Sequence, residues 1–103
     1  MVRESVERRT DRRGPVRHLA ALLPGGEAVE VLEAGRRGIF IALEDPDRFP
    51  LGARLEVTIT GRGHRAIARA EVVRKEIDPR RGVALLIVHM SPTAAEDYKA
   101  MLE

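Results

Sequence analysis

The clearest strand pattern in the chain is Arg54-Leu55-Glu56-Val57-Thr58-Ile59-Thr60, in which polar and apolar residues alternate without a break. Side chains of a β-strand point alternately to opposite faces, so this segment has one apolar face and one polar face. Leu55, Val57 and Ile59 must face the core, because a register slip of one residue would bury Glu56. The segment therefore predicts a strand in a sheet with one buried and one exposed face.

Five further segments on either side of this strand also have the character of strands, and they are separated by turns rich in glycine, proline and aspartate. Together they predict six short antiparallel strands, which favours a small β-barrel. The last of them is apolar on both faces, so we expect it to be the most buried. The five segments are residues 16–23, 27–32, 38–43, 66–74 and 83–88.

The end of the chain changes to a helical period. Ser91 is a good N-cap and Pro92 is an ideal first helical residue. Four later residues then share one helical stripe. We expect a C-terminal helix over residues 91–103 that lies across an end of the barrel, with an apolar stripe formed by Ala94, Tyr98, Met101 and Leu102.

Length and local composition indicate the domain organisation. A chain of 103 residues is one domain. Residues 1–15 contain five arginines and almost no apolar residues, so this segment cannot bury itself in a core. We expect a mobile arginine-rich arm over residues 1–15 and a single barrel domain over residues 16–103.

Composition also disfavours several classes of protein. Cysteine is absent, which excludes disulfides and thiolate metal sites. No run of 18 or more apolar residues occurs and no secretory signal is evident, so we expect a cytoplasmic protein without membrane insertion. Aromatic residues make up 3% of the chain, which leaves few platforms for stacking the bases of single-stranded nucleic acid.

The chain shows no arrangement typical of catalysis. A nucleophile needs a neighbouring base and a group that orients that base, and the sole serine of the predicted domain, Ser91, is assigned to the helix start. His18, His64 and His89 lie in three different segments without the spacing of metal ligands. We therefore predict a protein that is not an enzyme and that has no metal site and no cofactor.

Arginine is the most unusual feature of the composition. Sixteen of the 18 basic residues are arginine, a residue that can bind phosphate or a guanine edge through two parallel hydrogen bonds. A GC-rich genome would also produce such an excess, so the positions of the arginines carry more information than their number. Two positions stand out, the cluster at residues 8–13 and the turn Gly35-Arg36-Arg37-Gly38, whose backbone N–H groups could hold an anion.

These two positions and the order of the strands resemble the PilZ domain family. That family carries an RxxxR motif just before its barrel, and residues 7–16 resemble this segment, with Arg9 and Arg13 at the two arginine positions. Arg8 and Arg12 form a second RxxxR one residue out of phase, so the register of the motif stays open. The resemblance implies a six-stranded barrel with a C-terminal helix that binds cyclic di-GMP, a bacterial second messenger.

The family's second motif, (D/N)xSxxG, corresponds to residues 33–38 and departs from the pattern at two positions. Glu33 stands where Asp or Asn is usual and Gly35 where Ser is usual, whereas Gly38 is kept. The missing serine hydroxyl removes one ligand hydrogen bond, which costs about 0.5–1.5 kcal/mol, or roughly 2- to 13-fold in affinity. Carried over to this chain, the ligand contacts implied by the resemblance are Arg8, Arg9, Arg12, Arg13, Glu33, Gly35, Arg37 and Gly38.

The resemblance implies a signalling module in which cyclic di-GMP orders the arm against the barrel and reshapes a surface for an unidentified downstream protein. An alternative keeps the fold without the ligand, as a degenerate PilZ interaction module in a motility or signalling assembly. A third reading takes the arm as a nucleic-acid tail. We do not expect nucleic acid as a partner, because three acidic residues are interleaved with the first five arginines.

Overall fold

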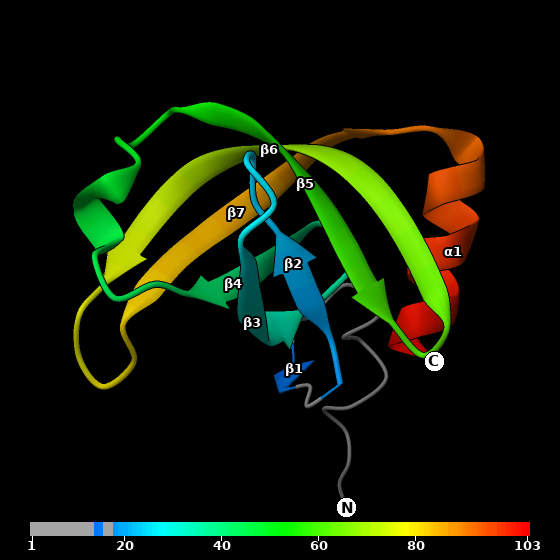
Figure 1. Ribbon diagram of the computed structural model, residues 1–103, viewed down its shortest axis with the longest axis horizontal. Coiled ribbons are helices and arrows are strands. Elements are labelled where there is room, and N and C mark those ends of the chain that lie inside the picture. Colours follow the sequence, from blue (N-terminus) through cyan, green and yellow to red (C-terminus); the bar gives the residue numbers. More distant parts are fainter. Residues whose placement is uncertain (1–13, 16–17) are drawn as a thin grey trace, which may run out of the picture.

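The protein is a closed antiparallel β-barrel with one α-helix. The computed structural model describes residues 14–15 and 18–103. All strands belong to one sheet that closes on itself (Figure 1). The strands are β1 (Gly14–Pro15), β2 (Ala20–Leu22), β3 (Ala28–Ala34), β4 (Gly38–Ala42), β5 (Arg54–Gly61), β6 (His64–Glu76) and β7 (Gly82–Met90); the helix is α1 (Pro92–Leu102). The predicted mainly β fold with a C-terminal helix is confirmed.

Six strands, β2 to β7, form the ring of the barrel. They are hydrogen-bonded in the order β3-β2-β5-β6-β7-β4, and β4 closes the ring by pairing with β3. The two-residue strand β1 lies on the side of β3 opposite β4, because Glu33 and Ala34 pair with both strands. The predicted first strand, residues 16–23, is shorter than expected at Ala20–Leu22, and residues 16–17 lie outside the described part.

Strand β5 has the inward and outward faces that its alternation predicts. Leu55, Val57 and Ile59 are buried, whereas Arg54 and Glu56 are exposed. A two-residue turn joins β5 to β6, with positive φ at both Arg62 and Gly63. Turns of this kind match the right-handed twist of a hairpin, and glycine adopts such a conformation at little cost.

Strand β6 is longer than the predicted segment 66–74 because it pairs with β5 along one edge and with β7 along the other. Its inward residues are small, and the helix packs mainly against this strand. A row of alanines leaves room for the larger side chains that α1 contributes to the core. These inward residues are Ala66, Ala68, Ala70 and Val72, each at most 1% exposed.

The expectation that residues 83–88 form the most buried strand is wrong. Val83 to Leu85 are buried, but Leu86 is 40% exposed and Val88 is 36% exposed. Strand β4 covers one edge of β7 only from Gly82 to Leu86. Beyond that point a register shift between β6 and β7 displaces Val88 from the regular pairing. The most continuously buried strand is β4, in which only Ala42 is partly exposed.

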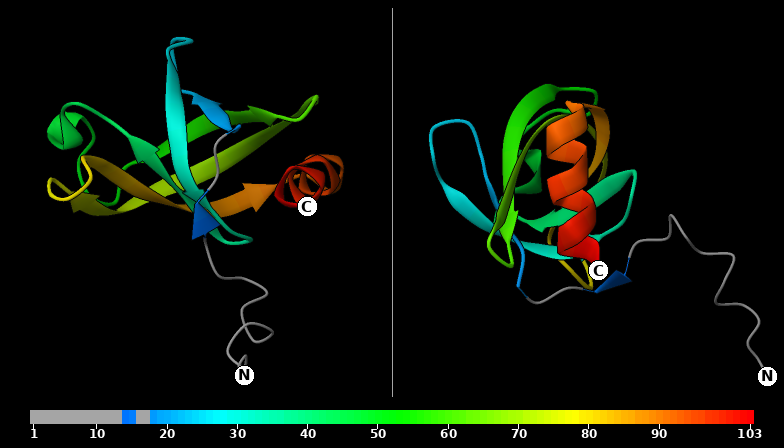
Figure 2. Two further views of the ribbon diagram at one scale, coloured as in Figure 1. Left: turned by 90° about the horizontal axis from the view of Figure 1, so that it is seen from below. Right: turned by 90° about the vertical axis from the view of Figure 1, so that its right-hand side faces the viewer.

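Helix α1 begins as the sequence predicts. The hydroxyl oxygen of Ser91 accepts a hydrogen bond from the Ala94 N–H at 3.1 Å, and Pro92 is the first helical residue. Three residues of the predicted stripe, Ala94, Tyr98 and Met101, are buried against the barrel, whereas the fourth, Leu102, is only partly buried. The helix lies across one end of the barrel, as both views of Figure 2 show.

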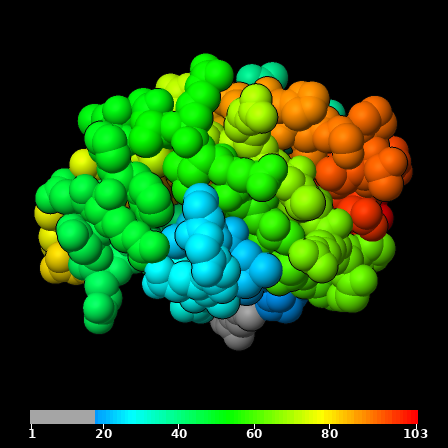
Figure 3. All heavy atoms as spheres, turned by 45° about the horizontal axis from the view of Figure 1, so that its top comes forward, coloured from blue at the N-terminus to red at the C-terminus, as the bar shows by residue number. Residues whose placement is uncertain are grey.

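The short 3-10 helix η1 (Pro46–Arg48) lies at the end of the barrel opposite α1 (Figure 3). Asp45 caps it by accepting a hydrogen bond from the Asp47 N–H at 3.0 Å. The described part of the chain contains no helix that is long and apolar enough to span a membrane.

Candidate functional site

The first candidate residue, Glu33, lies on strand β3, one residue beyond the predicted strand segment 27–32. A register shift interrupts the pairing of β3 with β4 between Val31 and Glu33. Val31 and Ala34 are both in the core, so the inserted residue turns Glu33 to the outer face of the barrel. Strict alternation from Val31 would have pointed Glu33 inward. The irregularity therefore leaves the carboxylate accessible at the barrel surface, with 30% of the side chain exposed.

The turn that follows, Gly35 to Gly38, is held by three hydrogen bonds. The Gly35 N–H donates to the Gly38 carbonyl at 3.0 Å, and the Ile87 N–H donates to the Arg37 carbonyl at 2.8 Å. The hydroxyl of Tyr98 donates to the Gly35 carbonyl and so ties α1 to the turn. The Gly35 N–H is thus occupied within the turn itself. The side chains of Arg36 and Arg37 are exposed.

Gly38 has a packing role in this turn. A Cβ atom at this position would lie 2.5 Å from the carbonyl oxygen of Leu85. Real Cβ atoms do not approach a backbone oxygen this closely, and a backbone oxygen of a central strand cannot move aside easily. Only glycine therefore lets β4 approach β7 closely enough for Gly38 to pair with Leu86.

Strand β1 brings the N-terminal segment to the same place. Gly14 pairs with Ala34, and Pro15 pairs with Glu33. Gly14 and Pro15 directly follow the predicted RxxxR segment in the sequence. The predicted ligand arginines Arg8, Arg9, Arg12 and Arg13, and most of the predicted arm, lie outside the described residues.

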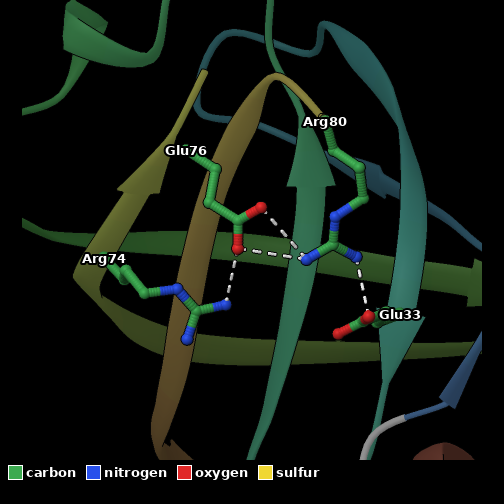
Figure 4. A network of polar contacts seen from close by, with 4 residues as sticks. All are labelled: Glu33, Arg74, Glu76 and Arg80. Atoms are coloured by element: carbon green, nitrogen blue, oxygen red, sulfur yellow. Dashed lines mark hydrogen bonds and ion pairs between the residues drawn. The ribbon is translucent and has the colours of Figure 1, made fainter. Parts of the chain in front are cut away.

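A network of alternating charges surrounds Glu33 on the barrel surface (Figure 4). One nitrogen of the Arg80 guanidinium lies 2.7 Å from Oε2 of Glu33. A second nitrogen of the same group donates to Oε2 of Glu76 at 3.1 Å, and Arg74 donates to that same oxygen at 3.0 Å. The two guanidinium groups balance the two carboxylates, and Arg80 stands between them.

Arg80 is also held by an aromatic ring. Its guanidinium carbon lies 4.1 Å from the centre of the Phe40 ring, within the range of a cation–π interaction. Phe40 faces outward between the core residues Ile39 and Ile41, yet it is fully buried. Phe40 is the strand partner of Glu33, so the ring, the carboxylate and the guanidinium share one patch of the outer surface.

The network changes the acidity of Glu76. The hydrogen bond from Arg80 lowers the pKa of the Glu76 carboxyl below its ordinary value of 4.5, while partial burial acts in the opposite direction and Arg74 lowers it further. A carboxyl whose pKa is lowered by folding stabilises the folded state above its unfolded pKa. This contribution is lost as the pH falls through the folded-state pKa.

We therefore expect a Glu76→Gln variant to lose less stability in acid than the wild type. Thermal unfolding measured from about pH 6 to about pH 3 should show the wild-type melting temperature falling more steeply. Glu56→Gln, at an exposed position of β5, is the control and should behave like the wild type. Parallel curves for the wild type and Glu76→Gln would contradict the role of this carboxylate.

The other ionisable side chains of the described residues form no second candidate site. No group of three or more histidine, aspartate or glutamate side chains in this part of the chain could hold a metal ion. His64 contacts Asp97 at 2.9 Å and joins the start of β6 to α1, while His18 and His89 lie in other segments.

Sequence reasoning identified Glu33, Gly35 and Gly38 but missed the residues that hold them. The sequence indicates no more than a turn between the strand segments 66–74 and 83–88, although Arg80 in this turn contacts Glu33. Nothing in sequence spacing links positions 33 and 80. The same holds for the hydrogen bond from Tyr98 to Gly35, because the helical stripe predicts burial of the ring and says nothing of its hydroxyl.

Comparison with known families gives one match. A family model described as "PilZ domain" matches residues 7–103, which is nearly the whole chain and includes both candidate motifs. No curated protein and no solved structure matches the chain significantly.

Proposed function

The chain belongs to the PilZ domain family, and from this membership we propose that it is a non-enzymatic signalling module that binds cyclic di-GMP. The family is one of nucleotide-binding domains, in which the ligand is recognised by an RxxxR motif and by a second motif on the barrel. In this chain the proposed contacts are Arg8, Arg9, Arg12, Arg13, Glu33, Gly35, Arg37 and Gly38.

The observation that carries the proposal is the pairing of β1 with the end of β3. Gly14 and Pro15 pair with Ala34 and Glu33, so the two residues that follow the RxxxR segment in the sequence lie beside the second motif. Cyclic di-GMP carries two phosphates and two guanine bases. Arginines can bind both phosphate and guanine through paired hydrogen bonds, and a carboxylate can accept from the N1–H and N2–H donors of guanine.

The turn of residues 35–38 would form one half of the proposed ligand site, and this half is already rigid. Three hydrogen bonds fix residues 35–38 before any ligand arrives, so little entropy is lost there on binding. The second half would come from the arginines at residues 8–13, and ligand binding would order them against the barrel. Such ordering of a segment is a common way to create or remove a surface for a partner protein.

Calorimetric titration with cyclic di-GMP tests the proposal. We expect heat and a dissociation constant on the order of micromolar, because the missing serine hydroxyl weakens binding without abolishing it. GMP, with one base and one phosphate, is the control ligand and should bind far more weakly. The absence of heat with protein at about tens of micromolar would contradict the proposal. It would favour the alternative of an interaction module that does not bind the nucleotide.

A further inference from the structure

The position of Arg80 extends the proposed function, and the following inference rests on it. We propose that Arg80 is a positioning residue that neutralises Glu33 and orients its carboxylate, so that an acidic residue can stand in a site for a doubly negative ligand. Arg80 lies in the connection between β6 and β7, outside both motifs of the family.

The charge of the ligand is the electrostatic reason why Glu33 needs a neutralising partner. Cyclic di-GMP has two negative phosphates, and an unpaired carboxylate at Glu33 would repel them at short range. Arg80 contacts Oε2 of Glu33 at 2.7 Å and so cancels this charge where the ligand would approach. A carboxylate neutralised in this way still has free lone pairs for guanine donors, because each carboxylate oxygen can accept two hydrogen bonds.

Arg80 can orient the Glu33 carboxylate because three neighbouring groups hold its own guanidinium in place. Its guanidinium lies over the Phe40 ring at 4.1 Å, and its other nitrogen reaches both oxygens of Glu76 at 3.1 and 3.3 Å. Glu33 is the strand partner of Phe40, so the ring and the carboxylate are positioned by the same pair of strands. Arg80 therefore presents a rigid donor to one oxygen of Glu33 and leaves the other directed away from it (Figure 4).

The role of Arg80 is tested by a double-mutant cycle with Arg80→Met and Glu33→Gln. Methionine keeps an apolar side chain over Phe40 but removes the charge, which protects the fold. We expect Arg80→Met alone to weaken cyclic di-GMP binding by about 2- to 5-fold, a range appropriate for a partly exposed ion pair. In the Glu33→Gln background the same substitution should change affinity by less than about twofold, because no carboxylate remains to be neutralised.

Arg81→Met is the matched control. Arg81 is the next residue of the same connection and is exposed, so its replacement should leave the affinity at the wild-type value. Equal weakening by Arg80→Met in both backgrounds, or no weakening in either, would overturn the inference.

Measurements without ligand separate this inference from the proposed function. Thermal unfolding of the wild type, the two single variants and the double variant should show non-additive effects of Arg80→Met and Glu33→Gln, because the two side chains contact each other. Additive effects would overturn the inference even if cyclic di-GMP binds. If the wild type gives no calorimetric heat, the proposed function and the role of Arg80 toward the ligand are both overturned. Non-additive unfolding in that case would still confirm that Glu33 and Arg80 interact.

Discussion

A Gly38→Ala variant is expected to fold less stably than the wild type by about 1–3 kcal/mol, the usual cost of forcing an extra methyl group into a packed site. The added Cβ would lie 2.5 Å from the carbonyl oxygen of Leu85, and relief requires β4 and β7 to separate. Unfolding temperatures of a domain of this size change by roughly 4–8 °C per kcal/mol. The loss should therefore be obvious in a thermal melt without ligand.

Arg36→Ala is the control for this variant. Arg36 lies two residues earlier in the same turn and is exposed, and such surface substitutions usually change stability by less than about 0.5 kcal/mol. A Gly38→Ala protein that melts at the wild-type temperature would contradict the close approach of β4 and β7. Because the melt is measured without ligand, it reports the packing role of Gly38 alone and not its proposed contact with the ligand.

The second large effect is expected from the arginines of the N-terminal motif. Arg9→Ala and Arg13→Ala should each weaken cyclic di-GMP binding by roughly 13- to 160-fold, since each removes hydrogen bonds to a charged group worth about 1.5–3 kcal/mol. Calorimetry on each variant measures the loss. The melting temperature without ligand should stay near the wild-type value, because both residues belong to the arginine-rich segment 1–15, which has too few apolar residues to join the core.

Two comparisons sharpen this prediction. Arg8→Ala and Arg12→Ala test the other register of the motif, and smaller losses in these variants would assign the motif to Arg9 and Arg13. Arg65→Ala, at an exposed position at the start of β6, controls for the general loss of a positive charge. Equal losses in all five variants would indicate non-specific attraction, and no loss in any of them would contradict the proposed site.

The barrel could be predicted from local patterns because each strand carries its own evidence. The alternation of residues 54–60 fixes which side of β5 is buried, and Ser91 with Pro92 fixes the start of α1. The exposure of Leu86 could not be predicted, because it depends on the neighbouring strand: Leu86 pairs with Gly38, which has no side chain to cover it. An apolar residue shows only that burial is favourable, and neighbouring strands decide whether it occurs.

The candidate site was predictable only in part for the same reason. Short motifs placed Glu33 and Gly38 together, since they are close in the sequence. The β-bulge that turns Glu33 outward and the contact with Arg80 depend on pairing between distant segments. The sequence alone therefore indicated the candidate turn but not the charged network that holds the carboxylate of Glu33.

The most direct test is to map cyclic di-GMP on the full chain by the chemical shifts of backbone amides. The largest shifts should occur at Gly14 and in the turn of residues 35–38, with smaller shifts near Arg80. The amides of residues 25–27, in the turn between β2 and β3 at the other end of β3 from Glu33, should not move. Saturating ligand that leaves residues 35–38 unshifted, or that shifts residues 25–27 most, would contradict the proposed binding of cyclic di-GMP beside Glu33.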